Sequence, residues 1–321
     1  MIAHNLTVRN NIFYHRGTGF AATYDGTSFV SDHNDFFTSG PNLASGNNYG
    51  VATTLDQWRT ISGRDNNSIS VNPQLETAIP FNAHAIELNN AAAPTPLVTT
   101  DINGQSRSAT TPDIGAREFA PDPVDARLVA FNGLTPPLAS GNVPVKVVLK
   151  NNGSSPLTSA QIDLQINNAT PTTTIWTGNL SSGDTAIVNV GVVTLTPLQA
   201  NRLLSWSSMP NGITDPFPLN DSIKVDSLYA GLSGTYTIGG TTPNFPTFTA
   251  AVNTLRLAGV VGGVTFNVRN GTYTEQIVLR PTAGVSAANT VTFQSESGDS
   301  TGVVLTWSAT TSDRNYTMQL F

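Results

Sequence analysis

The 321-residue sequence contains no cysteine, which excludes disulfide bonds and thiolate metal sites. Charged residues are scarce, at 11%, and aromatic residues make up only 8%. The formal net charge is −6, and the few arginines are scattered along the chain. Because phosphate binding needs a concentrated basic face, nucleic acid is not an expected partner. The chain is expected to depend on the size of its core for stability.

Long apolar runs are also missing. No stretch approaches the roughly 20 apolar residues of a membrane-spanning helix, and residues 1–11 lack the basic and apolar regions of an export signal. Met1 is followed at once by a strand-like run, and the sequence stops on another, Thr317–Phe321. We therefore expect no membrane span, an export signal outside this sequence, and further domains of the same polypeptide at both ends.

The residues that are abundant favour short strands joined by tight turns. Asn, Gly and Pro favour turns, and Thr and Val suit pleated strands, so helix is expected to be scarce. The length is sufficient for roughly two or three domains. We predict an all-β fold.

An internal repeat indicates a solenoid in the first part of the chain. Residues 10–13, Asn-Asn-Ile-Phe, return 24 positions later as residues 34–37, Asn-Asp-Phe-Phe, and Leu6 and Val30 occupy the matching place upstream. In a parallel β-helix each coil places apolar side chains inward and stacks Asn at its turns, so equal spacing is a physical requirement. The alternative is chance recurrence in an Asn-rich stretch.

Four later segments resemble the closing coils of right-handed parallel β-helices of the pectate-lyase-like superfamily. The resemblance implies that residues 1–119 are the C-terminal end of such a β-helix. Residues 82–87 depart from it, because Asn-Ala-His-Ala-Ile-Glu stands where the family usually has a Ser-Pro-Ala-Ile-Asp type of segment. The four segments are Leu55–Trp58, Asn72–Leu75, Asp101–Arg107 and Asp113–Phe119.

Residues 120–123, Ala-Pro-Asp-Pro, form a predicted linker, since proline interrupts regular strand pairing. Behind it, short alternating runs are each bounded by Gly, Asn, Ser or Pro, which is typical of a β-sandwich. Three segments, at 150–153, 176–180 and 218–222, resemble bacterial Ig-like modules related to cell-adhesion domains. We therefore expect an Ig-like β-sandwich over residues 124–229.

The pattern changes again from Gly234. Phe248, Ala251, Val252 and Leu255 follow helical spacing behind Pro246, which predicts one amphipathic helix near residues 245–257. Strand-like runs follow at 263–268 and 270–279. The combination resembles the cap and first coils of a second β-helix, as found in very large surface proteins of Bacteroidetes-type bacteria. Residues 234–321 are expected to form these coils, with the helix covering their open end.

Asp32, His33 and Asp35 form the densest polar cluster on a predicted coil, and they are the candidates for catalysis. Hydrolysis of a polysaccharide needs paired carboxylates, and a lyase needs a base. Strand alternation is expected to place Asp32 on the face opposite His33 and Asp35.

The remaining polar motifs predict neither a metal site nor a cofactor. His4, His15 and His84 are isolated, and we expect each to be solvated or locally hydrogen-bonded. The segment beginning at Asp101 fails as an EF-hand loop, because Ser106 stands where Gly is required. Asp101, Arg107 and Asp113 are expected to form a structural network in which the Arg side chain binds carboxylates.

Two further sets of residues are compatible with glycans. Asp184-Thr185-Ala186 and Asp221-Ser222-Ile223 resemble the short O-glycosylation sites of Bacteroidetes-type bacteria. Tryptophan side chains can stack on sugars, although single Trp residues more often lie in cores or interfaces. The four are Trp58, Trp176, Trp206 and Trp307.

Two functions remain open on the sequence alone. The chain is either a structural or adhesive segment of an extracellular or cell-surface protein, with a polysaccharide or cell-surface glycan as partner and no catalysis of its own. Alternatively, it belongs to a polysaccharide lyase or glycoside hydrolase whose active coils lie outside this sequence. Fold alone does not decide between them.

Overall fold

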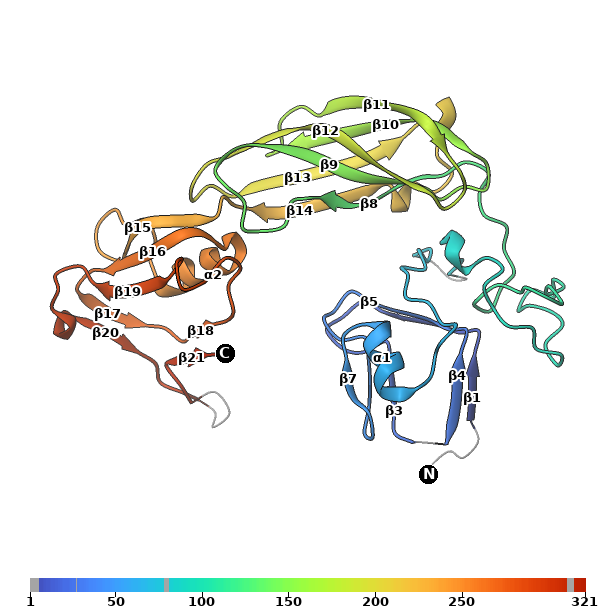
Figure 1. The fold of residues 1–321 in the computed structure, drawn as a ribbon, viewed down its shortest axis with the longest axis horizontal. Coiled ribbons are helices and arrows are strands. Elements are labelled where there is room, and N and C mark those ends of the chain that lie inside the picture. Colours follow the sequence, from blue (N-terminus) through green and yellow to red (C-terminus); the bar gives the residue numbers. More distant parts are fainter. Residues whose placement is uncertain (1–5, 27, 78–80, 311–314) are drawn as a thin grey trace.

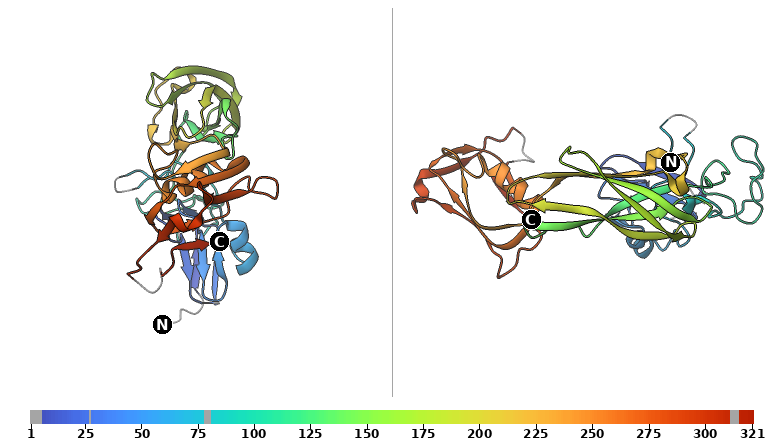
Figure 2. Two further views of the ribbon diagram at one scale, coloured as in Figure 1. Left: turned by 90° about the vertical axis from the view of Figure 1, so that its left-hand side faces the viewer. Right: turned by 90° about the horizontal axis from the view of Figure 1, so that it is seen from above.

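The computed structural model describes residues 6–26, 28–77, 81–310 and 315–321, and most of its elements are short strands (Figure 1). The strands form three successive groups, which we call the first unit (6–119), the sandwich (126–228) and the second unit (232–321). The two units lie at opposite ends of the sandwich and on the same side of it, so that the chain forms an arch (Figures 1 and 2). Only two α-helices occur among the described residues, which confirms that helix is scarce.

Parallel strands of the first unit make two successive coils of three strands each. The first coil contains β1 (Leu6–Arg9), β2 (Ile12–His15) and β3 (Ala22–Tyr24). The second contains β4 (Phe29–Asp32), β5 (Asp35–Thr38) and β6 (Ala44–Gly46). Each strand of the first coil pairs in parallel with the strand three places later. A short strand β7 (Gly50–Ala52) then adds antiparallel to β6.

The repeat is real, but paired residues are 23 positions apart in β1/β4 and β2/β5 and 22 apart in β3/β6, rather than 24. Phe13 lies opposite Phe36, and their rings stack with centroids 5.2 Å apart. At the turn, Asn11 stacks on Asn34, whose Oδ1 accepts hydrogen bonds from the Asn11 backbone and side chain at 3.0 and 3.1 Å. Asn10 instead has φ 60° and bonds to Ala93. The doublet Asn10-Asn11 made the two registers hard to distinguish in the sequence.

Residues 53–119 differ from the predicted stack of closing coils. No strand occurs between β7 and residue 126 in the described part of the chain, apart from isolated bridges such as the parallel one between Asp35 and Ile69. Helix α1 (Leu55–Ser62) begins behind Thr54, whose hydroxyl accepts a hydrogen bond from the Gln57 backbone, and ends at Gly63 with φ 66°. A 3₁₀ turn, η1 (Ile86–Leu88), begins at the end of the segment that departs from the family pattern.

The sandwich consists of two antiparallel sheets around one apolar core. One sheet has the strand order β11-β10-β13-β14 and the other β12-β9-β8. Buried residues of both sheets, such as Leu149, Ile162 and Leu203, belong to a single cluster. Two 3₁₀ turns, η2 (Pro210–Gly212) and η3 (Pro218–Asn220), lie between the last two strands. The strands are β8 (Ala126–Asn132), β9 (Gly141–Asn151), β10 (Leu157–Ile166), β11 (Thr172–Leu180), β12 (Thr185–Leu195), β13 (Asn201–Ser208) and β14 (Ser222–Leu228).

The second unit repeats the parallel arrangement. Strand β15 (Leu232–Ile238) precedes helix α2 (Phe248–Ala258), whose buried residues include all four predicted for its apolar face. Two coils then stack in parallel through the pairs β16/β19, β17/β20 and β18/β21, and β15 pairs with β16. Their bounds are β16 (Val260–Val268), β17 (Gly271–Thr274), β18 (Ile277–Leu279), β19 (Val291–Ser295), η4 (Ser300–Gly302), β20 (Val303–Thr306) and β21 (Met318–Leu320). Neither α-helix of the described residues has the length and apolar surface that crossing a bilayer requires.

Candidate functional site at the first junction

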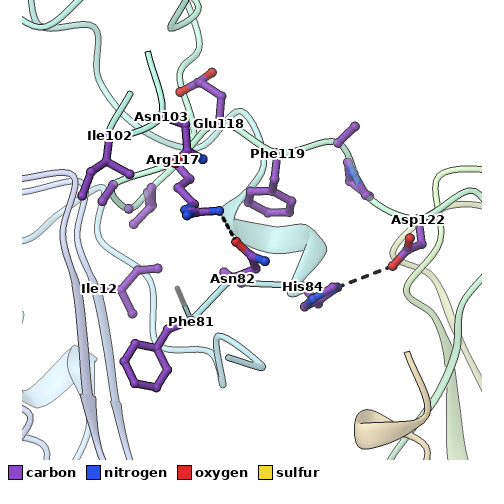
Figure 3. A pocket seen from close by; sticks show the side chains of 16 residues that line it. Ile12, Phe81, Asn82, His84, Ile102, Asn103, Arg117, Glu118, Phe119 and Asp122 are labelled. Carbon is purple, nitrogen blue, oxygen red and sulfur yellow. Dashed lines mark hydrogen bonds and ion pairs between the residues drawn. The ribbon is translucent and has the colours of Figure 1, made fainter. Parts of the chain in front are cut away.

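A cavity of about 440 Å³ lies between the irregular end of the first unit and the linker to the sandwich (Figure 3). The half-exposed ring of Phe81 and the partly buried ring of Phe119 line it together with polar side chains. Arg117 donates a hydrogen bond to the side-chain oxygen of Asn82. The cavity therefore combines apolar ring surface with fixed hydrogen-bonding groups, the usual composition of a small-molecule site.

His84 connects this cavity to the sandwich. Its Nε2 lies 3.2 Å from Glu76 Oε1, and its Nδ1 lies 3.5 Å from Asp122 Oδ2. Its ring also stacks on Phe217, with centroids 3.8 Å apart. This confirms the prediction of a locally bonded histidine, and it assigns His84 a role in joining the first unit to the sandwich.

The junction continues inward as a buried polar network. Asn152 Nδ2 donates to the His84 carbonyl oxygen at 3.0 Å and to Asp125 Oδ2 at 2.6 Å. Asn220 Nδ2 donates to Gln74 Oε1 at 2.8 Å and to the Asp125 carboxylate. Two sandwich residues thus reach back to the first unit while both bind one aspartate. Buried amides of this kind specify a fixed orientation, because leaving them unpaired is costly.

Three buried carboxylates meet at the centre of this network. Asp125 precedes β8, Asp215 lies between η2 and η3, and Asp221 lies between η3 and β14. Their exposed fractions are 1%, 8% and 6%, and one oxygen atom from each lies within 4.8 Å of the other two. Asp215 accepts backbone hydrogen bonds from Ala126 at 3.0 Å and from Phe217 at 2.9 Å. Asp221 Oδ1 is buried and has no hydrogen-bond partner.

The electrostatics of this acidic cluster favour a neutralising proton or cation. Burial, reinforced by Asp215 and Asp125, raises the pKa of Asp221 to about 8. Burial also raises the pKa of Asp125 to about 6, against the opposing effect of the hydrogen bond from Asn152. The pKa of Asp215 is raised by its burial and by Asp122. Three negative charges in a site with little water repel one another, so the cluster holds positive charge readily.

The catalytic candidates from the sequence do not form such a group. Asp32 and His33 were expected on opposite strand faces, but this is wrong: His33 has φ 54° and lies at the corner between β4 and β5, so its Nδ1 contacts Asp32 Oδ2 at 3.1 Å. Asp32 is partly exposed, and its carboxylate accepts hydrogen bonds from Asn67 at 2.7 and 2.8 Å. Partial burial raises its pKa, but the hydrogen bonds from Asn67 outweigh this effect and leave the pKa below its ordinary value.

Asp35 is buried inside the first unit. Its Oδ1 accepts a hydrogen bond from the Val71 backbone at 2.9 Å, and its Oδ2 has no partner. Burial raises the pKa of Asp35 to about 7, although the hydrogen bond from Val71 opposes the shift. Asp35 therefore faces the interior while Asp32 faces Asn67 at the surface.

The predicted network of Asp101, Arg107 and Asp113 exists in a different form. Arg107 pairs with the Glu118 carboxylate at 3.1 Å, and its guanidinium donates to the carbonyl oxygens of Asp113 and Gly115. The two aspartate side chains instead accept backbone hydrogen bonds, Asp101 at 2.8 Å from Asn103 and Asp113 at 2.7 Å from Asn90. The expected binding of both carboxylates by Arg107 is therefore wrong.

The other sequence candidates are dispersed. His15 accepts a hydrogen bond from the Gly19 backbone, as expected, and His4 lies outside the described residues. Trp58 is fully buried and donates to Asp65 Oδ2 at 2.9 Å, whereas Trp307 is 42% exposed. Asp184-Thr185 is exposed, but the Asp221 of the other glycosylation-like segment belongs to the acidic cluster.

The acidic cluster was not predicted from the sequence. Asp125 is separated by 90 residues from Asp215, and only folding of the sandwich brings the two together. All three aspartates lie next to or near prolines in the sequence, but such segments are equally typical of ordinary turns. No family model, curated protein or solved structure matches the chain.

Proposed function

We propose that the chain is a structural segment of a large extracellular or cell-surface protein, in which an Ig-like sandwich holds two segments of parallel β-helix at fixed positions. The observation that carries this proposal is that the sandwich contacts both neighbouring units through several separate segments. The parallel three-strand coils and the sequence resemblance to Bacteroidetes-type surface proteins support the same assignment.

The first junction is the polar network described above. His84 and Gln74 of the first unit contact Asn152, Phe217 and Asn220 of the sandwich. Next to it, the Lys150 ammonium pairs with Glu87, and the Lys150 side chain is only 8% exposed. These contacts come from several separate loops, so rotation about the linker would break all of them together.

The second junction is apolar and tightly packed. Only residues 229–231 connect β14 to β15, and the Gly231 backbone donates to the Leu138 carbonyl oxygen at 2.7 Å. A Cβ atom placed on Gly259 or Gly284 would lie 3.0 Å from the Pro137 ring. The loop before β9 therefore rests directly against the glycine-lined start of the second unit, which leaves little space for a hinge.

Relaxation of backbone ¹⁵N nuclei tests the proposal. We expect amides of the first unit, the sandwich and the second unit to fit one tumbling model for the whole chain. A control variant with a flexible Gly-Ser insertion between Tyr229 and Ala230 should let the second unit tumble faster than the rest. Independent tumbling of the three groups in the unmodified chain would contradict the proposal.

The alternative function is that of a polysaccharide lyase or glycoside hydrolase whose active coils lie outside this sequence. Hydrolysis requires two carboxylates that face one substrate. Asp32 is hydrogen-bonded to Asn67 at the surface, whereas Asp35 is buried against Val71. The arrangement of these two candidates therefore supports the structural function better than catalysis.

A polysaccharide or cell-surface glycan is the partner we propose for this segment. The cavity in Figure 3 offers the ring of Phe81 for stacking and the polar groups of Asn82 and Arg117 for hydrogen bonds. Titration with pectin and alginate oligosaccharides, monitored by NMR, should shift amides around this cavity and not those of the distant α2. Shifts spread evenly over the chain, or none at all, would contradict the assignment of this cavity.

A further inference from the structure

We propose that Asp125, Asp215 and Asp221 bind a single calcium ion at the junction between the first unit and the sandwich. This inference goes beyond the structural function and does not depend on it, since the cluster is formed by residues of the sandwich and its leading segment. It rests on the geometry of the three carboxylates, on the unpaired polar atoms around them, and on the kind of ligand atoms present.

The first observation is the spacing of the carboxylates. One oxygen from each lies within 4.8 Å of the other two. Two oxygens on opposite sides of a calcium ion, each at roughly 2.4 Å, are about 4.8 Å apart. The three side chains therefore already lie at separations compatible with binding one ion, and they come from two segments that meet only in the folded sandwich.

The second observation is a concentration of buried atoms without partners. Among the described residues, seven buried side-chain nitrogen or oxygen atoms lack a hydrogen-bond partner, and four of them belong to this network. One is Oδ1 of Asp221, and two are the Oδ1 atoms of Asn152 and Asn220, which are at least nine-tenths buried. Leaving such atoms unpaired is costly, so their grouping beside three carboxylates points to a ligand.

The two asparagines differ in whether they can supply a further oxygen ligand. Each now donates its Nδ2 to Asp125. A half-turn of the Asn220 amide about its terminal torsion exchanges nitrogen and oxygen in place, which would turn its unpaired Oδ1 toward the carboxylates. Asn152 keeps its present orientation, because its Nδ2 also donates to the His84 carbonyl oxygen. A matching half-turn of Gln74 would direct its Nε2, which also lacks a partner, at Asn220. The site then offers four oxygen-bearing side chains, Asp125, Asp215, Asp221 and Asn220.

The ligand atoms favour calcium over other ions. The set contains carboxylates and amides but no sulfur, and both nitrogens of nearby His84 face other carboxylates. Oxygen ligands are preferred by calcium and magnesium, and calcium accepts six to eight of them in irregular geometry, whereas magnesium requires a near-ideal octahedron. Asp122 adds negative charge near the cluster, and Arg127 is a cation that interacts electrostatically with Asp125. This excess of negative charge excludes anions.

Direct binding measurements test the proposal. After removal of metals with a chelator, isothermal titration with CaCl₂ should give one equivalent bound per chain, with magnesium at least tenfold weaker. Calcium should also shift the amide resonances of Ala126 and Phe217, whose N–H groups donate to Asp215. No binding at millimolar calcium, or binding that leaves these two amides unchanged, would overturn the proposal.

Variants locate the site independently. Asp221→Asn should weaken calcium binding at least tenfold. The matched control is Asp226→Asn, because Asp226 is an exposed aspartate on β14 that pairs with Lys224 instead. Equal calcium affinity in the two variants would refute the assignment. If Asp221→Asn does not fold, the binding and amide shifts of the unmodified chain still decide the question.

Discussion

Without calcium, the acidic cluster should make the sandwich less stable as pH rises. The pKa of Asp221 is raised from 3.8 to about 8 by burial and by its two carboxylate neighbours. Below about pH 4 the carboxyl is protonated in both the folded and the unfolded chain. Between pH 4 and 8 the unfolded chain releases this proton while the folded chain retains it, so the free energy of unfolding falls as pH rises.

The size of the effect follows from the shift. One pKa unit corresponds to about 1.4 kcal/mol, so a shift of about four units sets an upper limit of roughly 6 kcal/mol. Asp221 is only 6% exposed, which leaves little screening by water. Because Asp125 and Asp215 titrate together with Asp221, we expect a measured loss on the order of 3 kcal/mol between pH 4 and 8.

The assay compares the chelated protein with Asp221→Asn, which cannot titrate at this position. Urea unfolding followed by ¹⁹F NMR of fluorotryptophan distinguishes the sandwich, through Trp176 and Trp206, from the two flanking units. The stability of the unmodified chain relative to the variant should decrease steadily from pH 4 to 8. Calcium at pH 8 should restore it, because the ion replaces the missing positive charge.

Asp226→Asn serves as the control variant. The hydrogen bond from Lys224 holds the pKa of Asp226 below its ordinary value, and Asp226→Asn removes this effect. The free energy of unfolding of this variant should therefore differ from that of the unmodified chain only above about pH 4, and by a constant amount. If the free energy of unfolding of the unmodified chain, relative to that of Asp221→Asn, stays constant or rises from pH 4 to 8, then burial does not raise this pKa and the prediction is wrong.

The remaining predictions concern the two units and the surface. Phe36→Ala should destabilise the first unit by about 3–5 kcal/mol, measured from the ¹⁹F signal of Trp58, because Phe36 is fully buried. Phe37→Ala should cost less, because Phe37 is only half-buried. Equal costs would argue against a register in which Phe36 faces the core. Gly284→Ala should destabilise the second unit, because a Cβ there would lie 2.0 Å from the Val260 carbonyl oxygen and φ is +86°. An unchanged free energy of unfolding of the second unit would contradict this packing. The isolated chain should not cleave pectin or alginate, and release of unsaturated products or new reducing ends would support the enzymatic alternative.

Much of the local structure could be predicted from the sequence. The apolar spacing from Phe248 to Leu255 predicted α2, and alternating runs bounded by turn residues predicted the strands of the sandwich. Helix α1 was missed although its signals were present: Thr54 and Gln57 have capping-box spacing, and Gly63 supplies the left-handed residue at the end.

Features of the tertiary structure were harder to predict from the sequence. The one-residue error in the first repeat arose because Asn10 and Asn11 are identical residues, and only the positive φ of Asn10 reveals which one stacks on Asn34. The direction of the His33 side chain was predicted wrongly, because side chains alternate between faces only within a strand and His33 lies at the corner between two strands. The acidic cluster could not be predicted, because nothing in the local sequence states that Asp125 meets residues 90 positions later.

The central claim, that the sandwich holds both units at fixed positions, is tested most directly by one distance across the whole arch. The chain has no cysteine, so Thr60→Cys on α1 and Asn253→Cys on α2 can be spin-labelled selectively. Both positions are exposed, and between them lie both junctions. Double electron–electron resonance should give one narrow distance distribution, comparable in width to that of a label pair within the sandwich. A broad distribution would show that the junctions are flexible and would contradict the account.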